Sequence, residues 1–172
     1  MNNLSILLCF LFTYIFSSIG FSTSLDTPNL HNVETGLYRS GHPTQQGLRD
    51  LKNNLKIKTI VDLEENTDAI YQEKLDANNL GINFISLPMS AFYKPSDSEV
   101  NQIETLIRNP NLRPLLVHCR LGMDRTGLIV GLHRVSDDTW SSTRAYNEML
   151  QFGFHPEFFE LYKYFKIKTN LP

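Results

Sequence analysis

Cys119 and Arg125 are separated by five residues, in the segment His-Cys-Arg-Leu-Gly-Met-Asp-Arg-Thr-Gly that covers 118–127. The apolar run 114–118 before it is typical of a buried central strand, and the apolar run 126–135 after it is typical of a helix. In a loop that joins a strand to a helix start, backbone N–H groups can point at one anion, and the helix adds a partial positive charge. The spacing therefore predicts an anion-binding loop, with phosphate as the anion.

The two residue types fit a nucleophile beside a bound phosphate. The guanidinium of Arg125 can hold two phosphate oxygens in bidentate fashion. The same N–H groups and charge favour the thiolate form of Cys119, which is the nucleophilic form. A lone cysteine is by default a small, buried apolar residue, but these neighbours favour a nucleophile.

The segment resembles the active-site signature of the cysteine-based protein phosphatases, which is His-Cys, five residues, Arg, Ser or Thr, and Gly, and it matches at every position. Within that superfamily the chain is similar to the small atypical dual-specificity phosphatases of bacteria, plants and fungi. The resemblance extends over 33–156, supported by the segments 37–43, 140–145, 148–149 and 153–155.

The resemblance implies a two-step hydrolysis without a metal ion or cofactor. Cys119 attacks phosphorus, and water then releases phosphate from the phosphocysteine. Thr126 would donate a hydrogen bond to the sulfur and make it a better leaving group. The residues implied to bind phosphate are Arg120, Leu121, Gly122, Met123, Asp124, Arg125 and Thr126.

The residue that protonates the leaving oxygen is open. Relatives usually carry an Asp on the loop after the strand that corresponds to 84–87, but the loop 88–95 holds no carboxylate. Asp97 is the nearest acidic residue, although its place at a helix start already explains it. Asp124 lies inside the loop and resembles the Asp at the same position of myotubularin-like lipid phosphatases. A bound phosphate dianion would favour its protonated form, whereas Arg125 would oppose this.

Strand and helix patterns alternate along the chain. They predict an α/β domain with a central, mostly parallel sheet of four to five strands, flanked by helices, with the phosphate-binding loop after a central strand. We expect strands at 37–40, 57–63, 84–87 and 114–118. We expect helices from Thr44, over 68–79, from the capping box of Ser96 and Glu99 to 108, over 126–135, from Ser141 to Gly153, and from Pro156 onward.

The first 24 residues contain no Lys, Arg, Asp or Glu. Their apolar run and the small residues after it indicate a secretory signal peptide over 1–24, followed by a single phosphatase domain over 25–172. We therefore expect an exported, periplasmic or secreted protein without stable membrane insertion after cleavage. An uncleaved N-terminal anchor is the alternative. Cleavage would remove Cys9 and leave Cys119 without a disulfide partner.

The net charge of −2 argues against nucleic acid as a partner. We expect a monomer that acts on a phosphorylated protein or a small phosphate ester. The charges of the loop sum to +1, because Asp124 offsets one of Arg120 and Arg125, which favours lightly phosphorylated substrates. The alternatives are an inositol-phosphate or phosphoinositide phosphatase, a non-catalytic phosphate-binding module and a rhodanese-type sulfurtransferase.

Some residues near the motif have an equally simple structural explanation. His118 is expected to order the loop rather than to act as an acid or a ligand. Arg39 and His42 are either ordinary turn residues or supports beside the site. The remaining histidines show no metal-ligand spacing with one another, so no metal site is expected.

Overall fold

The computed structural model describes residues 26–172, so the predicted signal peptide lies outside the described residues. At its centre is a five-stranded sheet with the order β1-β2-β5-β3-β4. The last four strands in this order run parallel, and β1 pairs antiparallel with β2. This confirms the predicted α/β class with a mostly parallel sheet. The strands are β1 (His31–Glu34), β2 (Leu37–Ser40), β3 (Thr59–Asp62), β4 (Asn83–Ser86) and β5 (Leu115–His118).

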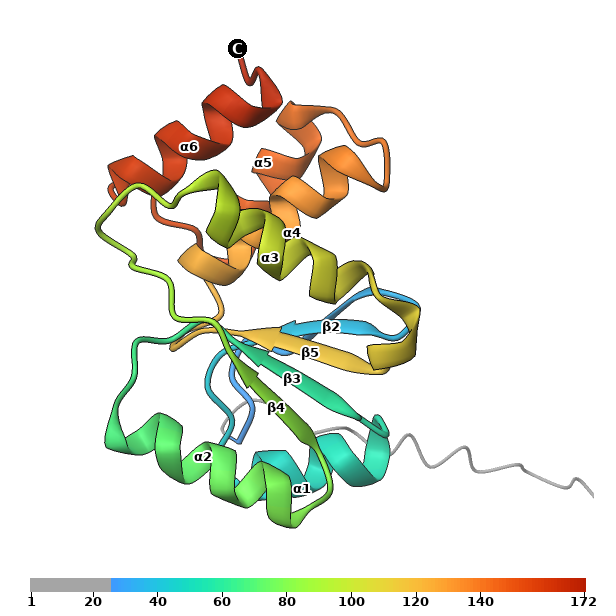
Figure 1. The fold of residues 1–172 in the computed structure, drawn as a ribbon. Helices are drawn as coiled ribbons and strands as arrows, with labels where there is room; N and C mark the ends of the chain where they lie inside the picture. The colour runs from blue at the N-terminus through green and yellow to red at the C-terminus, as the bar shows by residue number, and fades with distance from the viewer. Residues whose placement is uncertain (1–25) are drawn as a thin grey trace, which may run out of the picture.

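Helices cover both faces of the sheet (Figure 1). One face carries α1 (Gln45–Asn54) and α2 (Asp68–Asn79), and a smaller apolar core fills the space beneath them. The other carries α3 (Asp97–Arg108), α4 (Asp124–Ser136), α5 (Ser142–Gln151) and α6 (Phe159–Thr169) around the larger core. The four-residue strand β5 is buried throughout and lies between β2 and β3. The segment that follows it therefore begins at the middle of the sheet's carboxyl edge, where α/β proteins bind ligands.

Capping side chains begin three helices as predicted. Thr44 caps α1, the capping box of Ser96 and Glu99 starts α3, and Ser141 caps α5. Each cap satisfies an N–H group that the first turn leaves without an intrahelical partner.

Several predicted boundaries differ from the structure by one or two residues, and two helix starts and one strand need separate mention. Helix α4 begins at Asp124, two residues before the predicted start, so the end of the motif lies in its first turn. The predicted start of the last helix at Pro156 is wrong: Phe158 N–H donates to His155 O at 3.0 Å, and this turn delays α6 to Phe159. The strand β1 was not predicted, because only Val33 of its four residues is buried and no apolar alternation marks it.

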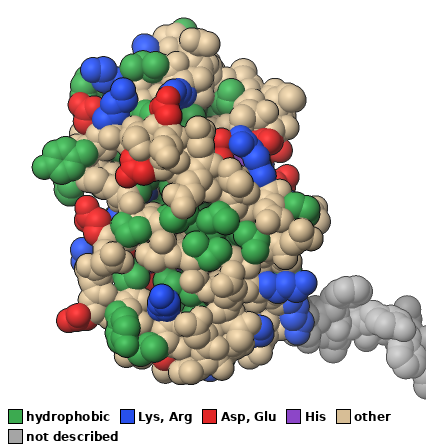
Figure 2. Space-filling model, in the orientation of Figure 1, with side chains coloured by type: hydrophobic (Ala, Val, Ile, Leu, Met, Phe, Trp, Pro, Cys, Tyr) green, Lys and Arg blue, Asp and Glu red, His purple; other side chains and the backbone are tan. Residues whose placement is uncertain are grey.

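Figure 2 shows positive and negative side chains interspersed over the visible face. No extended patch of one sign covers this face. Among residues 26–172, no helix has both the length and the apolar composition needed to cross a bilayer.

Candidate active site

The segment between β5 and α4 forms a short loop with Cys119 at its start. Cys119 directly follows β5 and is 2% exposed. Met123 stands at the N-cap of α4, and no side chain within 26–172 donates or accepts a capping hydrogen bond there. The N–H groups of an uncapped first turn are suited to binding an anion, and the helix dipole favours negative charge there. The loop thus joins a buried thiol to a helix start that can receive phosphate.

Gly122 is the residue that allows this loop to turn. Its φ is +69°, and a Cβ atom built on it would lie 2.4 Å from the carbonyl carbon and oxygen of Ser40. Its carbonyl oxygen accepts hydrogen bonds from Arg39 Nη2 at 2.6 Å and from Asn29 Nδ2 at 3.0 Å. Because the peptide is planar and trans, the N–H of Met123 points away from these two donors. The scaffold thereby fixes the direction of one loop N–H group.

Arg39 is buried beneath the loop at 1% exposure, with its guanidinium 4.8 Å from the ring centre of Phe152. Burial lowers the pKa of Arg39 to about 10, while the charges of Glu148 and Cys119 act in the opposite direction. The side chain remains a cation at neutral pH. The structure therefore confirms a supporting role for Arg39, which sequence reasoning had left open.

His42 also contacts the loop, through its backbone N–H, which donates to Arg120 O at 3.1 Å. Its ring pairs with Glu64, with Nδ1 and Oε1 2.9 Å apart. This hydrogen bond raises the pKa of His42, against the effect of burial. His42 is therefore a support beside the loop rather than an ordinary turn residue.

His118 is fully buried, and its Nε2 lies 3.1 Å from Glu73 Oε1 and 3.9 Å from Asp62 Oδ1. Burial has the largest single effect on the pKa of His118 and lowers it, but the close contact with Glu73 and the charges of Asp62 and Glu64 together outweigh burial and raise the pKa to about 9. Burial raises the pKa of Asp62 to about 6. His118 thus ties the end of β5 to α2, which agrees with the structural role expected for it. Glu73 is a partner that no local sequence pattern indicated.

The guanidinium of Arg125 is anchored by two carbonyl groups at the carboxyl edge of the sheet. Nη1 donates to Leu63 O at 3.2 Å and to Met89 O at 3.3 Å. These contacts hold the side chain between the end of β3 and the loop after β4.

The hydroxyl of Thr126 is fully buried and makes no hydrogen bond with any described residue. The predicted hydrogen bond from Thr126 to the sulfur of Cys119 is therefore not formed in this structure. Thr126 lies in the first turn of α4, so its backbone still belongs to the helix start that faces the loop.

The two acidic candidates have different surroundings. Asp124 is buried, and its Oδ1 accepts one hydrogen bond from the backbone N–H of His155 at 2.8 Å. The same oxygen lies 3.1 Å from the ring nitrogen Nδ1 of His155. The His155 ring is half exposed. Sequence reasoning missed His155 as a partner, because 31 residues separate the two.

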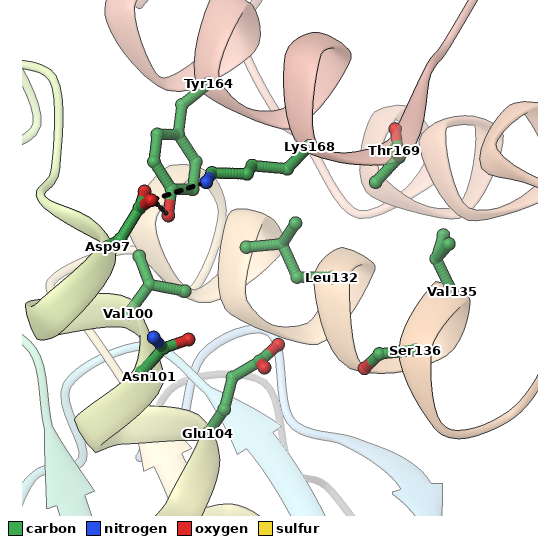
Figure 3. Close-up of a pocket in the computed structure, with 10 residues that line it drawn as sticks. All are labelled: Asp97, Val100, Asn101, Glu104, Leu132, Val135, Ser136, Tyr164, Lys168 and Thr169. Carbon is green, nitrogen blue, oxygen red and sulfur yellow. Dashed lines mark hydrogen bonds and ion pairs between the residues drawn. The ribbon is translucent and has the colours of Figure 1, made fainter.

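Asp97 lies at the start of α3, where it faces α6 (Figure 3). It pairs with Lys168 Nζ at 2.6 Å and accepts a hydrogen bond from Tyr164 at 3.0 Å. The hydrogen bond from Lys168 lowers the pKa of the Asp97 carboxyl. Its carboxylate therefore helps to fasten α6 to α3, and both of its side-chain partners belong to α6 rather than to the loop 119–123.

A row of rings leads from Asp124 to the loop after β4. His155 packs edge-on against Phe158, with ring centres 6.1 Å apart, and Phe158 lies 5.5 Å from Phe92. Phe92 is 71% exposed and Leu121, in the phosphate-binding loop, is 51% exposed. A cavity of about 240 Å³ at the end of this row is lined by Ala91, Phe92, Glu157, Phe158, Phe159 and Glu160. This side of the site is apolar and acidic.

Known proteins that are similar in sequence to this chain include phosphatases. The sequence model of a family described as "DSP-PTPase phosphatase fused to NAD+ Kinase" matches residues 13–157. The inositol diphosphatase SIW14 of Saccharomyces cerevisiae is 30% identical over 151 residues, which cover 81% of this chain and 53% of SIW14. The dual specificity protein phosphatase TpbA of Pseudomonas aeruginosa is 29% identical over 130 residues, 75% of this chain and 56% of TpbA. The chain thus spans about half the length of these curated relatives.

Solved structures of the same two proteins have the same fold. The core catalytic domain of SIW14 in complex with citrate gives a TM-score of 0.67 at 29% identity, with 73% of this chain and 76% of that chain covered. TpbA gives a TM-score of 0.69 at 27% identity, with 80% and 83% covered. A cysteine-to-serine variant of TpbA has been solved in complex with phosphotyrosine.

Proposed function

The chain belongs to the DSP-PTPase phosphatase family, and from this premise we propose that it hydrolyses phosphate monoesters through a phosphocysteine intermediate. The observation that carries the proposal is the position of Cys119, between a buried central strand and the uncapped start of α4. A thiolate there faces N–H groups that can bind phosphate, and Gly122 has its carbonyl oxygen held by Arg39 on the scaffold side.

The reaction follows from these positions in two steps. The Cys119 sulfur forms a bond to phosphorus while the bond from phosphorus to the ester oxygen breaks, and an acid protonates that oxygen. Water then attacks phosphorus and gives a proton back to the conjugate base of that acid, and the bond from sulfur to phosphorus breaks so that the thiolate leaves. The N–H groups of 120–126 and the Arg125 guanidinium balance the charge on the phosphate oxygens, which is where preorganised donors contribute most.

We propose that the hydroxyl of Thr126 serves the second step. It is buried and has no hydrogen-bond partner among the described residues. A buried donor without a partner is costly, and rotation of the hydroxyl toward a departing thiolate would satisfy it. The contact would therefore form in the phosphocysteine state.

We propose Asp124, together with His155, as the proton donor. Asp124 belongs to the first turn of α4 and its carboxylate contacts the His155 ring, which places both side chains at the helix start that would receive phosphate. Asp97 is less suited, because Lys168 and Tyr164 occupy its carboxylate and Lys168 favours its charged form.

For the substrate, we propose a phosphotyrosyl or other singly phosphorylated group. The exposed Phe92 and the contact between Phe92 and Phe158 offer an apolar surface beside the site, whereas Glu157 and Glu160 repel additional phosphates. The description of SIW14 as an inositol diphosphatase supports a phosphorylated inositol as the second candidate substrate.

For the location, we propose export through the segment 1–24, whose charge-free apolar composition supports it. Fractionation of the source cells, followed by the intact mass of the recovered chain, tests the proposal. A chain that lacks Cys9 in the exported fraction is expected. A full-length chain in the cytoplasmic fraction would contradict export, and a full-length chain in the membrane fraction would favour the anchor.

The phosphocysteine itself tests the activity. Wild-type chain is mixed with an aryl phosphate, quenched in acid within one turnover and digested, and phosphate is expected on the peptide that contains Cys119. Cys119→Ser should carry no label and should lose essentially all turnover, because this loop does not ionise a serine hydroxyl. It should still bind vanadate, because the donors of the loop are unchanged. Turnover of Cys119→Ser within about tenfold of wild type would refute the covalent mechanism. Sulfur transfer from thiosulfate to cyanide would instead indicate a sulfurtransferase.

A further inference from the structure

Behind the loop, on the α2 side of the sheet, two histidines and a glutamate meet. His42 follows β2, Glu73 belongs to α2 and His118 ends β5, and one donor atom of each lies within 4.8 Å of the others. The three residues are far apart in the chain, so their spacing in the sequence gives no sign of the cluster. None of the proposed catalytic steps uses it.

The contacts among His42, Glu73 and His118 are close, but none of them is a hydrogen bond of acceptable geometry. Glu73 Oε1 lies 3.1 Å from His118 Nε2, and Glu73 Oε2 lies 3.4 Å from His42 Nδ1. The side chains of Glu73 and His118 are 1% and 0% exposed. Even so, four of their buried polar atoms make no hydrogen bond of acceptable geometry with a described residue: both carboxylate oxygens of Glu73 and both ring nitrogens of His118. Buried polar atoms normally have such a partner.

The separations between these atoms fit a metal ion. Each ligand of a tetrahedral zinc site lies about 2.0–2.1 Å from the ion, so two ligands are about 3.3 Å apart. The two separations to Glu73, one from each of its carboxylate oxygens, lie on either side of this value, and one donor atom of each residue lies within 4.8 Å of the other two. A second carboxylate is at hand, because Glu64 Oε1 lies 2.9 Å from His42 Nδ1.

An ion can reach the cluster from solvent. A cavity of about 400 Å³ opens between the start of α1 and α2, and both His42 and Glu73 line it. Asp76 also lines it and adds negative charge that attracts a cation. His42 is the ligand nearest to solvent, with 28% of its side chain exposed.

We propose that His42, Glu73 and His118 bind one divalent transition-metal ion, with Zn²⁺ the best fit. Imidazole and carboxylate together suit Zn²⁺, whereas Mg²⁺ and Ca²⁺ prefer oxygen ligands alone. The ion would link β2, α2 and β5 directly behind Cys119, since His118 is the preceding residue. The proposal does not depend on the phosphatase activity. A plain ion-pair network is the competing explanation, and it predicts no specific metal affinity.

The test measures Zn²⁺ binding to the full chain by calorimetry, without a histidine tag and with Cys9→Ser and Cys119→Ser to remove both thiols. We expect one Zn²⁺ per chain, a higher melting temperature with Zn²⁺ than without, and no comparable effect of Mg²⁺. His42→Gln and Glu73→Gln should each weaken Zn²⁺ binding by at least about tenfold. The matched control is His155→Gln, which removes an exposed histidine outside the cluster and should bind Zn²⁺ like its parent.

His42→Gln is the variant that best separates lost metal binding from misfolding, because the His42 side chain is partly exposed and its replacement disturbs the core less than that of Glu73. Circular dichroism establishes that each variant is folded before titration. The proposal fails if the parent binds no Zn²⁺ at a one-to-one ratio. It also fails if folded His42→Gln binds as tightly as the parent, or if His155→Gln loses binding to the same extent.

Discussion

Arg39 Nη2 donates a 2.6 Å hydrogen bond to the carbonyl oxygen of Gly122, from a position 83 residues earlier in the chain. This bond links a strand of the scaffold to the turn of the phosphate-binding loop. Because burial removes Arg39 from water, the bond competes little with solvent. The direction of the loop N–H groups therefore depends on a residue that need not touch the substrate.

Arg39→Lys keeps the positive charge and loses the planar group that reaches Gly122. We expect kcat to fall by about ten- to a hundredfold, with a smaller change in KM, since displaced donors weaken transition-state binding most. Steady-state kinetics on an aryl phosphate measures both constants. Arg49→Lys, on α1 and away from the loop, is the control and should behave like wild type. An unchanged kcat for Arg39→Lys would mean that Asn29 alone orients Gly122.

Arg125→Lys should be far more damaging than its conserved charge suggests. The two carbonyl groups of Leu63 and Met89 anchor one nitrogen, so the planar fork can present its remaining donors to phosphate. A lysine has one nitrogen and cannot do both. We expect turnover to fall by at least about a hundredfold, as when one transition-state donor is removed. Near-normal kcat in Arg125→Lys would show that the loop N–H groups suffice.

What the sequence reveals about the site is mostly local. The motif around Cys119 and the caps at Ser96 and Ser141 each depend on residues a few positions apart, so a linear pattern could predict them. Periodicity likewise predicted the central strand β5 and the sheet around it.

The missing part of the prediction consists of long-range contacts. The contact of Asp124 with His155 spans 31 positions, and neither residue has a neighbour in the sequence that signals it. The same is true of Glu73 with His118, which the return of α2 to the sheet brings together. The turn after Pro156 was missed for a local reason, since proline also suits the first turn of a helix.

Glu34 gives a stability prediction with a defined pH range. Burial raises its pKa, but the hydrogen bonds and the charges of Arg113 and His133 together outweigh burial and lower it below its ordinary value of 4.5. A lowered pKa in the folded state stabilises the fold above the unfolded value, and this contribution is lost as the pH falls through the folded value. Glu34→Gln should therefore lower the free energy of unfolding at pH 7 and lose this effect at acid pH. Urea titrations of the wild-type protein and of Glu34→Gln at pH 7, 5 and 3.5 measure the free energy of unfolding of each. A constant difference between them would contradict the assignment.

The apolar side of the site predicts a preference for aryl phosphates. Phe92→Ala removes the exposed ring that contacts Phe158. An aromatic pair contributes about 0.5–1.5 kcal/mol, so kcat/KM on a phosphotyrosine peptide should fall about two- to tenfold. The same peptide with phosphoserine in place of phosphotyrosine is the control and should change little. An equal loss on both peptides would mean that Phe92 shapes the loop and does not contact the substrate.

Proton donation separates the two acidic candidates most sharply. Asp124→Asn keeps an oxygen for the His155 N–H but cannot donate a proton to the leaving oxygen. Two aryl phosphates are compared, one whose phenol is a good leaving group and one whose phenol is poor. General acid catalysis contributes about a hundred- to ten-thousandfold, so Asp124→Asn should lose at least about a hundredfold on the poor leaving group. On the good one it should lose less than about tenfold, because that phenolate leaves without a proton. The basic limb of the pH profile should also flatten.

His155→Gln removes the ring but not the backbone donor, and we expect a smaller loss with the same leaving-group dependence. Asp97→Asn breaks the pair with Lys168 and should lower the melting temperature without any dependence on the leaving group. If Asp97→Asn shows the leaving-group dependence and Asp124→Asn does not, the roles assigned to the two residues are reversed.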